Sequence, residues 1–150
     1  MSDPQILADF RTKFRVEELL IAKTPSWSWS VRPAQATLGA GVLSLNRHAA
    51  RFSEVSAAEM AELSELVATA ERALKADFDY DLINYLMLMM VDPHVHFHVI
   101  PRYRETRQFA GLEWSDSGWP GFPALAEQQH RDDPAILGLL RDALLTTCTK

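Results

Sequence analysis

Hydrophobic residues recur at the spacing of a helix in three parts of the chain. The first part runs from about residue 4 to 22 and follows an Asp-Pro pair that is typical of a helix start. The second part runs from about 57 to 76, behind a Ser-x-x-Glu capping box at 56–59. The third follows the Asp-Pro pair at 133–134, and its apolar face consists of Ile136, Leu139, Leu140, Ala143 and Leu144. The pattern therefore predicts three amphipathic helices.

Alternating apolar and polar residues predict strands between these helices. "SWSWSV" at 26–31 and "AGVLSLN" at 40–46 have the period of a half-buried strand. The apolar run at 80–90 is long enough for a helix, but a short "VDP" break and a strand-like segment follow it, which favours a strand. Consecutive strands with short connections pair antiparallel. We therefore expect an α+β domain, closed by an irregular segment at about 103–130 and a last helix.

Composition narrows the function classes. A net charge of −5 over 150 residues argues against broad nucleic-acid binding, but it permits a local basic pocket for one anionic ligand. Cys148 is the one cysteine, so neither an internal disulfide nor a zinc cluster of thiolates is possible, which fits a reducing, cytoplasmic compartment. The first residues do not resemble a signal peptide, and we expect no membrane-spanning segment.

The segment "DPHVHFHVIPR" at 92–102 carries the chemistry. On a strand, residues two apart share a face, so His94, His96 and His98 point the same way. Neighbouring histidines of the three are then roughly 6.6 Å apart along the strand. Val95 and Phe97 point to the other side, where they can anchor the strand in the core. The pattern therefore predicts a strand with one apolar face and one imidazole face.

Three interpretations of the imidazole face stay open at this point. The histidines could simply lie on a half-exposed surface. They could bind a metal, although the outer two are roughly 13 Å apart on a straight strand, and the further candidates Asp92, His48 and His130 have no telling spacing. Alternatively, one imidazole could attack a phosphorus atom while its neighbours hold phosphate oxygens.

The sequence His94-Val95-His96-Phe97-His98-Val99-Ile100 matches His-φ-His-φ-His-φ-φ, where φ is apolar, and it continues into Pro101-Arg102. In this pattern the chain resembles the histidine triad (HIT) family, and the tail "FAGLEWSDSGW" resembles that of small bacterial HIT proteins. The resemblance covers roughly residues 25–104. It implies one HIT-like domain over 1–150: an antiparallel sheet of about five strands per protomer, a long helix packed on it, and a C-terminal extension and helix at 105–150.

The resemblance also implies a function. HIT proteins hydrolyse or transfer nucleoside phosphates through a nucleotidyl-histidine intermediate, without a metal or another cofactor. Here His96 would be the nucleophile, His98 would bind the phosphate or assist the leaving group, and His94 would orient the others. Expected substrates are dinucleoside polyphosphates, nucleoside phosphoramidates or related esters, and the expected partner is a second copy of the chain. Alternatives are a nucleotide-binding module with little turnover, a nucleotidyl transferase or a metalloprotein.

The chain departs from the family pattern in its expected substrate contacts. Only "MVDP" at 90–93 is predicted to connect the two last strands, where many relatives have a longer phosphate-binding loop. Arg32 stands where relatives often have an asparagine that faces the ribose, and Asn84 is a polar substitute. Arg102 either belongs to a solvated basic stretch or holds outer phosphates. Trp114 either packs in the interior or covers a bound base.

Overall fold

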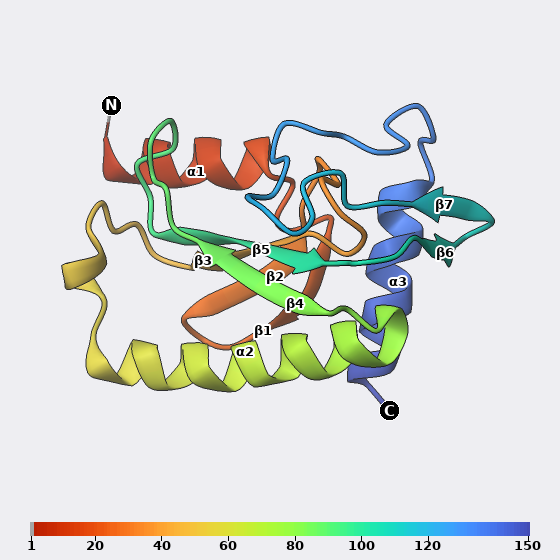
Figure 1. Cartoon of the computed structure of the whole chain (residues 1–150). Coiled ribbons are helices and arrows are strands. Elements are labelled where there is room, and N and C mark those ends of the chain that lie inside the picture. Colours follow the sequence, from red (N-terminus) through yellow and green to blue (C-terminus); the bar gives the residue numbers. More distant parts are fainter. Residues whose placement is uncertain (1) are drawn as a thin grey trace.

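The computed structural model describes residues 2–150, which form a five-stranded antiparallel sheet, a two-stranded hairpin and three α-helices (Figure 1). The strand order in the sheet is β1-β2-β3-β5-β4. The strands of the sheet are β1 Leu20–Lys23, β2 Trp27–Val31, β3 Gly41–Leu45, β4 Leu82–Leu86 and β5 His96–Arg102. The other elements are helices α1 Asp3–Lys13, α2 Ala57–Phe78 and α3 Ile136–Cys148, a short 3-10 turn at Phe52–Glu54, and the hairpin strands β6 Arg107–Phe109 and β7 Leu112–Trp114. The predicted α+β fold is thereby confirmed.

Helix α2 forms as its sequence predicts. The Ser56 hydroxyl accepts from the Glu59 amide at 3.1 Å, and the Glu59 carboxylate accepts from the Ser56 amide at 2.9 Å. Arg47 donates to the same carboxylate, and this ion pair lowers the pKa of Glu59 to about 2. The cap thus fixes where α2 begins, and α2 then covers one face of the sheet (Figure 1).

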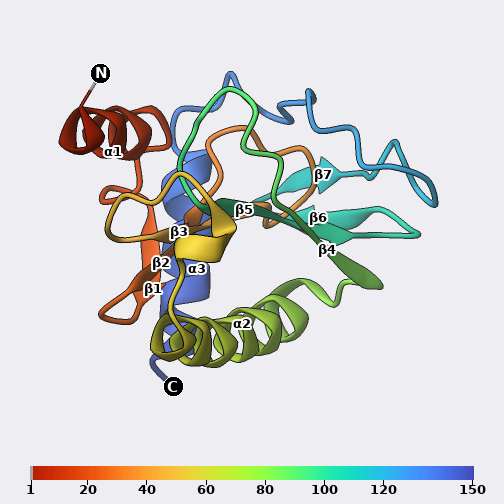
Figure 2. The same cartoon turned by 90° about the vertical axis from the view of Figure 1, so that its left-hand side faces the viewer.

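The core lies between the sheet and helices α2 and α3 (Figure 2). Its sheet side is built from alternate residues of the central strands: Trp27, Trp29, Val31, Leu43, Leu45, Val95 and Val99. Gly41 lies opposite Val31, and a Cβ there would come within 2.8 Å of the Trp29 indole nitrogen. Glycine at position 41 therefore lets β3 accommodate the large indole.

The N-terminal helix is shorter than its hydrophobic spacing predicts. It ends at Lys13 rather than near residue 22, and Arg15 takes a left-handed φ of 52° that turns the chain. Residues 20–23 then form the edge strand β1, paired antiparallel with β2. Val16, Leu19 and Ile21 are buried in this turn and strand, so tertiary packing overrides a spacing that fits a helix equally well.

Two other boundaries also differ from the prediction. The apolar run at 80–90 is a strand only over Leu82–Leu86, so nine residues, 87–95, connect β4 to β5 rather than the four of "MVDP". Met90 and Val91 in this connection are 84% and 80% exposed. The end of the apolar run is therefore not buried, although its composition predicted a strand. The segment predicted to be irregular contains the β6–β7 hairpin, turned at Gly111 with a φ of 74°.

Helix α1 lies across the sheet on the face opposite α2 (Figure 1). Its buried residue Phe10 packs with Phe14, Val16 and Val42 in a second, smaller apolar cluster. Val42 lies opposite His98 in the sheet, so this cluster lies on the imidazole face. Within residues 2–150, no helix has both the length and the apolar character needed to span a membrane.

Candidate active site

The three histidines of the motif lie on one face of the sheet, as predicted. His96 and His98 belong to β5 and lie opposite Ser44 and Val42 of β3, and their ring centroids are 5.1 Å apart. His94 precedes the strand, but its ring joins the same row, since Phe10 of α1 packs on both His94 and His96 at 4.9 and 4.8 Å. We call these three residues the triad.

Backbone groups hold His94 in one tautomer. Its Nε2 lies 2.8 Å from the Leu45 carbonyl, and the Ala49 amide donates to its Nδ1 at 3.4 Å. Because Nδ1 accepts, the ring proton must be on Nε2 and must be donated to the carbonyl. Burial lowers the pKa of His94 to about 4, so the ring is neutral at pH 7. Both ring nitrogens are engaged, which suits an orienting residue rather than a ligand or nucleophile.

His96 has the opposite tautomer. Its Nδ1 is 2.6 Å from the backbone carbonyl of His94, which can only accept, so Nδ1 carries the proton. The Nε2 atom then holds a lone pair. Burial lowers the pKa of His96 as well, which keeps that lone pair unprotonated near neutral pH. A neutral imidazole with an oriented Nε2 lone pair is the arrangement that a nucleophilic histidine requires.

His98 is bound by Arg32. The Arg32 Nε–H donates to His98 Nδ1 at 3.1 Å, and the Arg32 Nη1 donates to the carbonyls of Ala34 and Leu125 at 2.9 and 3.3 Å. Burial, and then the charge of Arg32, lower the pKa of His98 to about 4. The structure therefore brings Arg32 directly to the triad, which leaves the His98 Nε2–H as a donor.

Helix α1 covers the triad. Phe10 and Phe14 pack on the imidazoles, and His96 is only 2% exposed. A pocket of about 360 Å³ opens beside His98. It is lined by Lys13, Phe14, Arg32, Pro33, Ala34, Val91, Asp92 and His98. Lys13 forms an ion pair with Asp92 at 2.8 Å, which connects α1 to the segment between β4 and β5.

The sheet surface beneath α1 is polar. Ser44 lies opposite His96, and Ser30 lies opposite Val42, so both serines share the triad face. Both are 0% exposed, and neither hydroxyl has a hydrogen-bond partner in the described chain. Buried hydroxyls are normally paired. The surface therefore offers hydrogen-bonding groups that the phenyl rings of α1 do not use.

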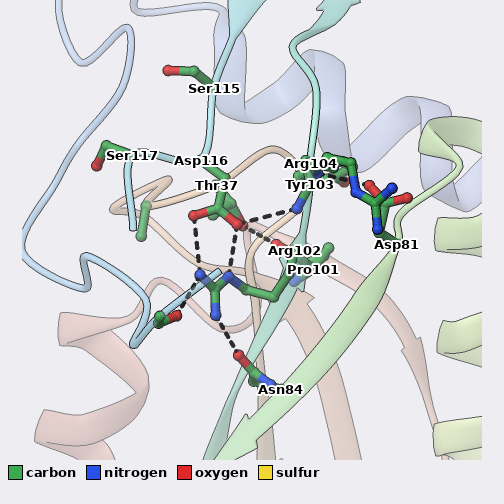
Figure 3. A network of polar contacts seen from close by, with 12 residues as sticks. Thr37, Asp81, Asn84, Pro101, Arg102, Tyr103, Arg104, Ser115, Asp116 and Ser117 are labelled. Atoms are coloured by element: carbon green, nitrogen blue, oxygen red, sulfur yellow. Dashed lines mark hydrogen bonds and ion pairs between the residues drawn. The ribbon is translucent and has the colours of Figure 1, made fainter. Parts of the chain in front are cut away.

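Arg102 and Asn84 do not form part of the triad (Figure 3). Arg102 is 3% exposed, its guanidinium is paired with the buried Asp116 at 2.7 Å, and it donates to the Asn84 side-chain oxygen at 2.8 Å. The Asp116 carboxylate also accepts from the Tyr103 amide at 3.1 Å. The predicted solvated or phosphate-binding role of Arg102 is therefore replaced by a structural one, because its charge is neutralised and buried.

Trp114 is also placed in the interior. It is 1% exposed, belongs to the main core and donates from its indole nitrogen to the Phe109 carbonyl at 3.2 Å. Its ring packs on His130 with centroids 4.5 Å apart. A side chain enclosed in this way has no face free for a nucleobase, which removes the predicted role in covering a base.

The hydrogen bonds also bear on the metal interpretation. His94 uses both ring nitrogens for backbone groups, and Arg32 occupies His98 Nδ1. In the part of the chain that the structure describes, no three His, Cys, Asp or Glu side chains converge as a metal site would require. Of the three rings, His94 therefore has no nitrogen free, whereas His96 and His98 each have a free Nε2.

Sequence reasoning missed the residues that α1 and the C-cap residue after it bring to the site. Phe10, Phe14 and Lys13 lie about eighty residues from the triad in sequence, and no motif connects them to it. His48 stacks on His94 with ring centroids 5.5 Å apart and hydrogen-bonds the Pro93 carbonyl at 3.1 Å. Two phenylalanines on one side of a helix predict that this side is buried, but they do not predict which surface it packs on.

Comparison with known proteins agrees with this geometry. Residues 41–105 match the family model described as the HIT domain, whereas no curated protein sequence matches the chain. A hypothetical histidine triad nucleotide-binding protein from Sulfolobus tokodaii superposes with a TM-score of 0.66 at 14% identity, over 97% of this chain and 91% of that one. A Hit-like protein involved in cell-cycle regulation from Bartonella henselae gives 0.63 at 15% identity, over 93% and 94%. A Zn-bound histidine triad family protein from Mycobacterium smegmatis gives 0.58 at 15%, over 87% and 86%.

At these identities the solved structures establish a shared fold. The family model adds sequence evidence, because the matched residues include the whole triad. The chain thus has the fold of histidine triad proteins, and its residues 41–105, which contain the triad, are similar in sequence to the HIT domain.

Proposed function

We propose that the protein is a nucleotide phosphohydrolase that works through a nucleotidyl-histidine intermediate. The match to the HIT domain supports a nucleotide-binding activity or one of the hydrolase or transferase type. The observation that carries the proposal is the pair of opposite tautomers at the centre of the triad. His96 has a free Nε2 lone pair, and His98 next to it has a free Nε2–H donor.

The proposed reaction has two steps. The His96 Nε2 attacks the α-phosphorus, a bond from nitrogen to phosphorus forms, and the bond to the leaving-group oxygen breaks with its electron pair. The imidazole ring then carries positive charge, which the hydrogen bond from Nδ1 to the His94 carbonyl stabilises. Water then attacks the phosphorus, the bond to nitrogen breaks, and the nucleoside monophosphate is released with the water's proton passing to solvent.

The proposed substrate is a dinucleoside polyphosphate or a related nucleoside phosphate ester or phosphoramidate. The pocket beside His98 supports an anionic group, because Arg32 lines it without an acidic partner in the described chain, whereas the charge of Lys13 is paired with Asp92. The buried Ser30 and Ser44 hydroxyls support a polar ligand on the sheet surface, since they have no other partner in the described chain. The family resemblance also supports a homodimer, and the single cysteine fits a reducing, cytoplasmic compartment.

The first test is a hydrolysis assay with diadenosine polyphosphates and adenosine phosphoramidate. We expect His96→Ala to lower kcat by about 10⁴-fold or more, because the nucleophile is lost. Mass spectrometry of the quenched wild-type reaction should detect an adenylyl adduct on the peptide that carries residue 96. His130→Ala is the matched control and should retain full activity. Wild-type rates in the His96 variant would exclude this nucleophile.

A second candidate function is nucleotide binding with little turnover. The pocket beside His98 favours it, because an anionic group can enter that pocket while Phe10 keeps His96 buried. Nucleotide binding seen by calorimetry without an adduct would support this candidate. A nucleotidyl transferase would form the same adduct but would pass the nucleotide to an acceptor other than water.

A further inference from the structure

The contact between Arg32 and His98 is unusual for a catalytic histidine. Such a ring more often donates its distal N–H to a carboxylate or carbonyl, which fixes the tautomer and makes the ring more basic. Here the partner is a guanidinium, which has only donors and stays protonated. His98 Nδ1 must therefore accept, and the single proton of the neutral ring must lie on Nε2.

The charged and titratable groups around His98 disfavour its protonation, with one exception. Arg32, the neighbouring His96 and Lys13 of α1 all disfavour a protonated ring, and Asp92 between β4 and β5 favours it. Burial is the largest influence and also disfavours protonation. His98 thus stays neutral near pH 7, and it donates a hydrogen bond from Nε2 without having a spare proton to transfer.

Arg32 also brings a positive charge to the part of the site beside His98. It takes part in none of the ion pairs found within residues 2–150. Its guanidinium is held by two carbonyls and lies largely inside the protein, which lowers its pKa through desolvation. A fixed cation of this kind stabilises negative charge that develops nearby.

These observations matter for the leaving group. When the bond between phosphorus and a bridging phosphate oxygen breaks, the oxygen keeps the electron pair and departs as part of an anion that needs no proton. When the bond to an amine breaks, the nitrogen must receive a proton. A neutral Nε2–H donor beside a guanidinium serves the first case and not the second.

We propose that Arg32 is a positioning residue that holds His98 as a neutral Nε2–H donor and thereby directs the site toward substrates whose leaving group departs as a phosphate anion. This inference rests on the proposed function, since it selects phosphoanhydrides over phosphoramidates within that reaction. The bond that forms joins His96 Nε2 to phosphorus, and the His98 proton stays on its nitrogen throughout.

The spectroscopic test does not depend on turnover. Long-range ¹H–¹⁵N spectra of the imidazole groups report which ring nitrogen carries the proton. In the wild-type protein, His98 should show the Nε2–H tautomer at pH 7 and should remain neutral at pH 5.5. In Arg32→Met, His98 should titrate at least one pH unit higher and should lose the single tautomer. Arg32→Lys keeps the positive charge but not the planar donor. In this variant His98 should keep its low pKa but should lose the single tautomer.

The kinetic test compares diadenosine tetraphosphate with adenosine 5′-phosphoramidate, which share the adenylyl group and differ in the leaving group. The wild-type protein should favour the tetraphosphate, and Arg32→Met should lower the ratio of the two kcat/KM values at least tenfold. Arg72→Met, an exposed arginine on α2, is the matched control and should leave the ratio unchanged.

Several outcomes would overturn the inference. One is a wild-type preference for the phosphoramidate. Another is an equal loss on both substrates in Arg32→Met together with an unchanged His98 tautomer, which would make Arg32 merely structural. If neither substrate forms an adduct in the wild-type protein, the proposed function is wrong. If His98 in the wild-type protein does not have the Nε2–H tautomer, the proposed role of Arg32 is wrong, whatever the activity. Should Arg32→Met fail to fold, the wild-type and Arg32→Lys spectra still decide.

Discussion

Arg102 and Asp116 form the most enclosed ion pair of the described chain, with side chains 3% and 1% exposed. The pair joins the end of β5 to the segment after β7, and Arg102 also donates to the Gly121 carbonyl at 2.8 Å (Figure 3). Removing one partner of such a pair leaves the other charge buried and unpaired. The pair therefore stabilises the attachment of the segment after β7 to the sheet.

We expect Asp116→Ala to lower the free energy of unfolding by about 3–5 kcal/mol, because Arg102 would lose its counter-ion. Denaturant unfolding measures this quantity. Asp142→Ala is the matched control: its pair with Arg141 lies at the surface, where the cost should be under about 1 kcal/mol. Equal stability of the two variants would contradict the anchoring role.

At the same scale, the sequence predicted the triad but not its partners. Strict alternation places His94, His96 and His98 on one face, and the structure confirms it. The tautomers depend on Arg32 and on the carbonyls of Leu45 and His94. Arg32 is 66 residues from His98, and backbone carbonyls have no sequence signature, so neither contact could be inferred from the pattern.

At the scale of elements, α1 decides access to the triad. Its apolar side packs on a sheet surface that contains three imidazoles and two unpaired serine hydroxyls. In the proposed reaction a substrate would reach His96 only after displacing this helix, so its apparent affinity would be reduced in proportion to the fraction of molecules in which α1 is displaced. The docking of α1 therefore competes with substrate binding.

We expect Phe10→Ala to raise kcat/KM roughly tenfold or more, because the loss of a buried phenyl ring weakens the docking of α1 by several kcal/mol. Faster hydrogen exchange at the triad should accompany the gain. Phe122→Ala, which removes a 69% exposed ring, is the matched control and should change neither quantity. A loss of activity in a folded Phe10→Ala protein would instead mean that the ring contacts substrate.

Elements with strong local signals were predicted well. The capping box of α2 and the alternation of β2 and β3 gave bounds that differ from the structure by a few residues at most. The failures lie where tertiary contacts decide between two conformations that fit the same residues. Residues 14–22 fit a helix by spacing, but pairing with β2 makes the end of this segment part of an edge strand.

For the whole molecule, buried neutral histidines make stability depend on pH. His94 and His98 have pKa values of about 4 in the folded protein, against about 6.5 for an unfolded histidine. Between these values the unfolded chain binds more protons than the folded one. Stability is therefore complete above about pH 6.5, decreases as the pH falls toward 4, and shows no further histidine contribution below that.

We expect the free energy of unfolding to decrease by on the order of 3 kcal/mol for each of these two rings between pH 7 and 4, as they become protonated on unfolding. Urea titrations at a series of pH values measure it. His94→Gln should remove part of this dependence, whereas His130→Gln should keep it. Glu59, with its pKa of about 2, loses its stabilising charge mainly below this interval and so adds little to it. An identical pH dependence in the two variants would exclude His94 as a source.

The overall architecture followed from the order of helices and strands, because antiparallel pairing of neighbours leaves few arrangements. The side of the sheet that each helix covers did not follow. α1 and α2 both have an apolar side, and the sheet has two faces, so only the completed fold assigns α2 to the valine and tryptophan face and α1 to the triad face.

The hydrogen bond from His96 Nδ1 to the His94 carbonyl has a consequence for how this protein could evolve. The orientation of the proposed nucleophile is set by a main-chain carbonyl two residues before it, and side-chain substitutions at other positions do not remove that group. The proposed determinants of substrate access and of leaving-group preference, α1 and Arg32, belong to other segments of the chain. Relatives could therefore exchange the cover or the substrate and keep the same attacking nitrogen in place.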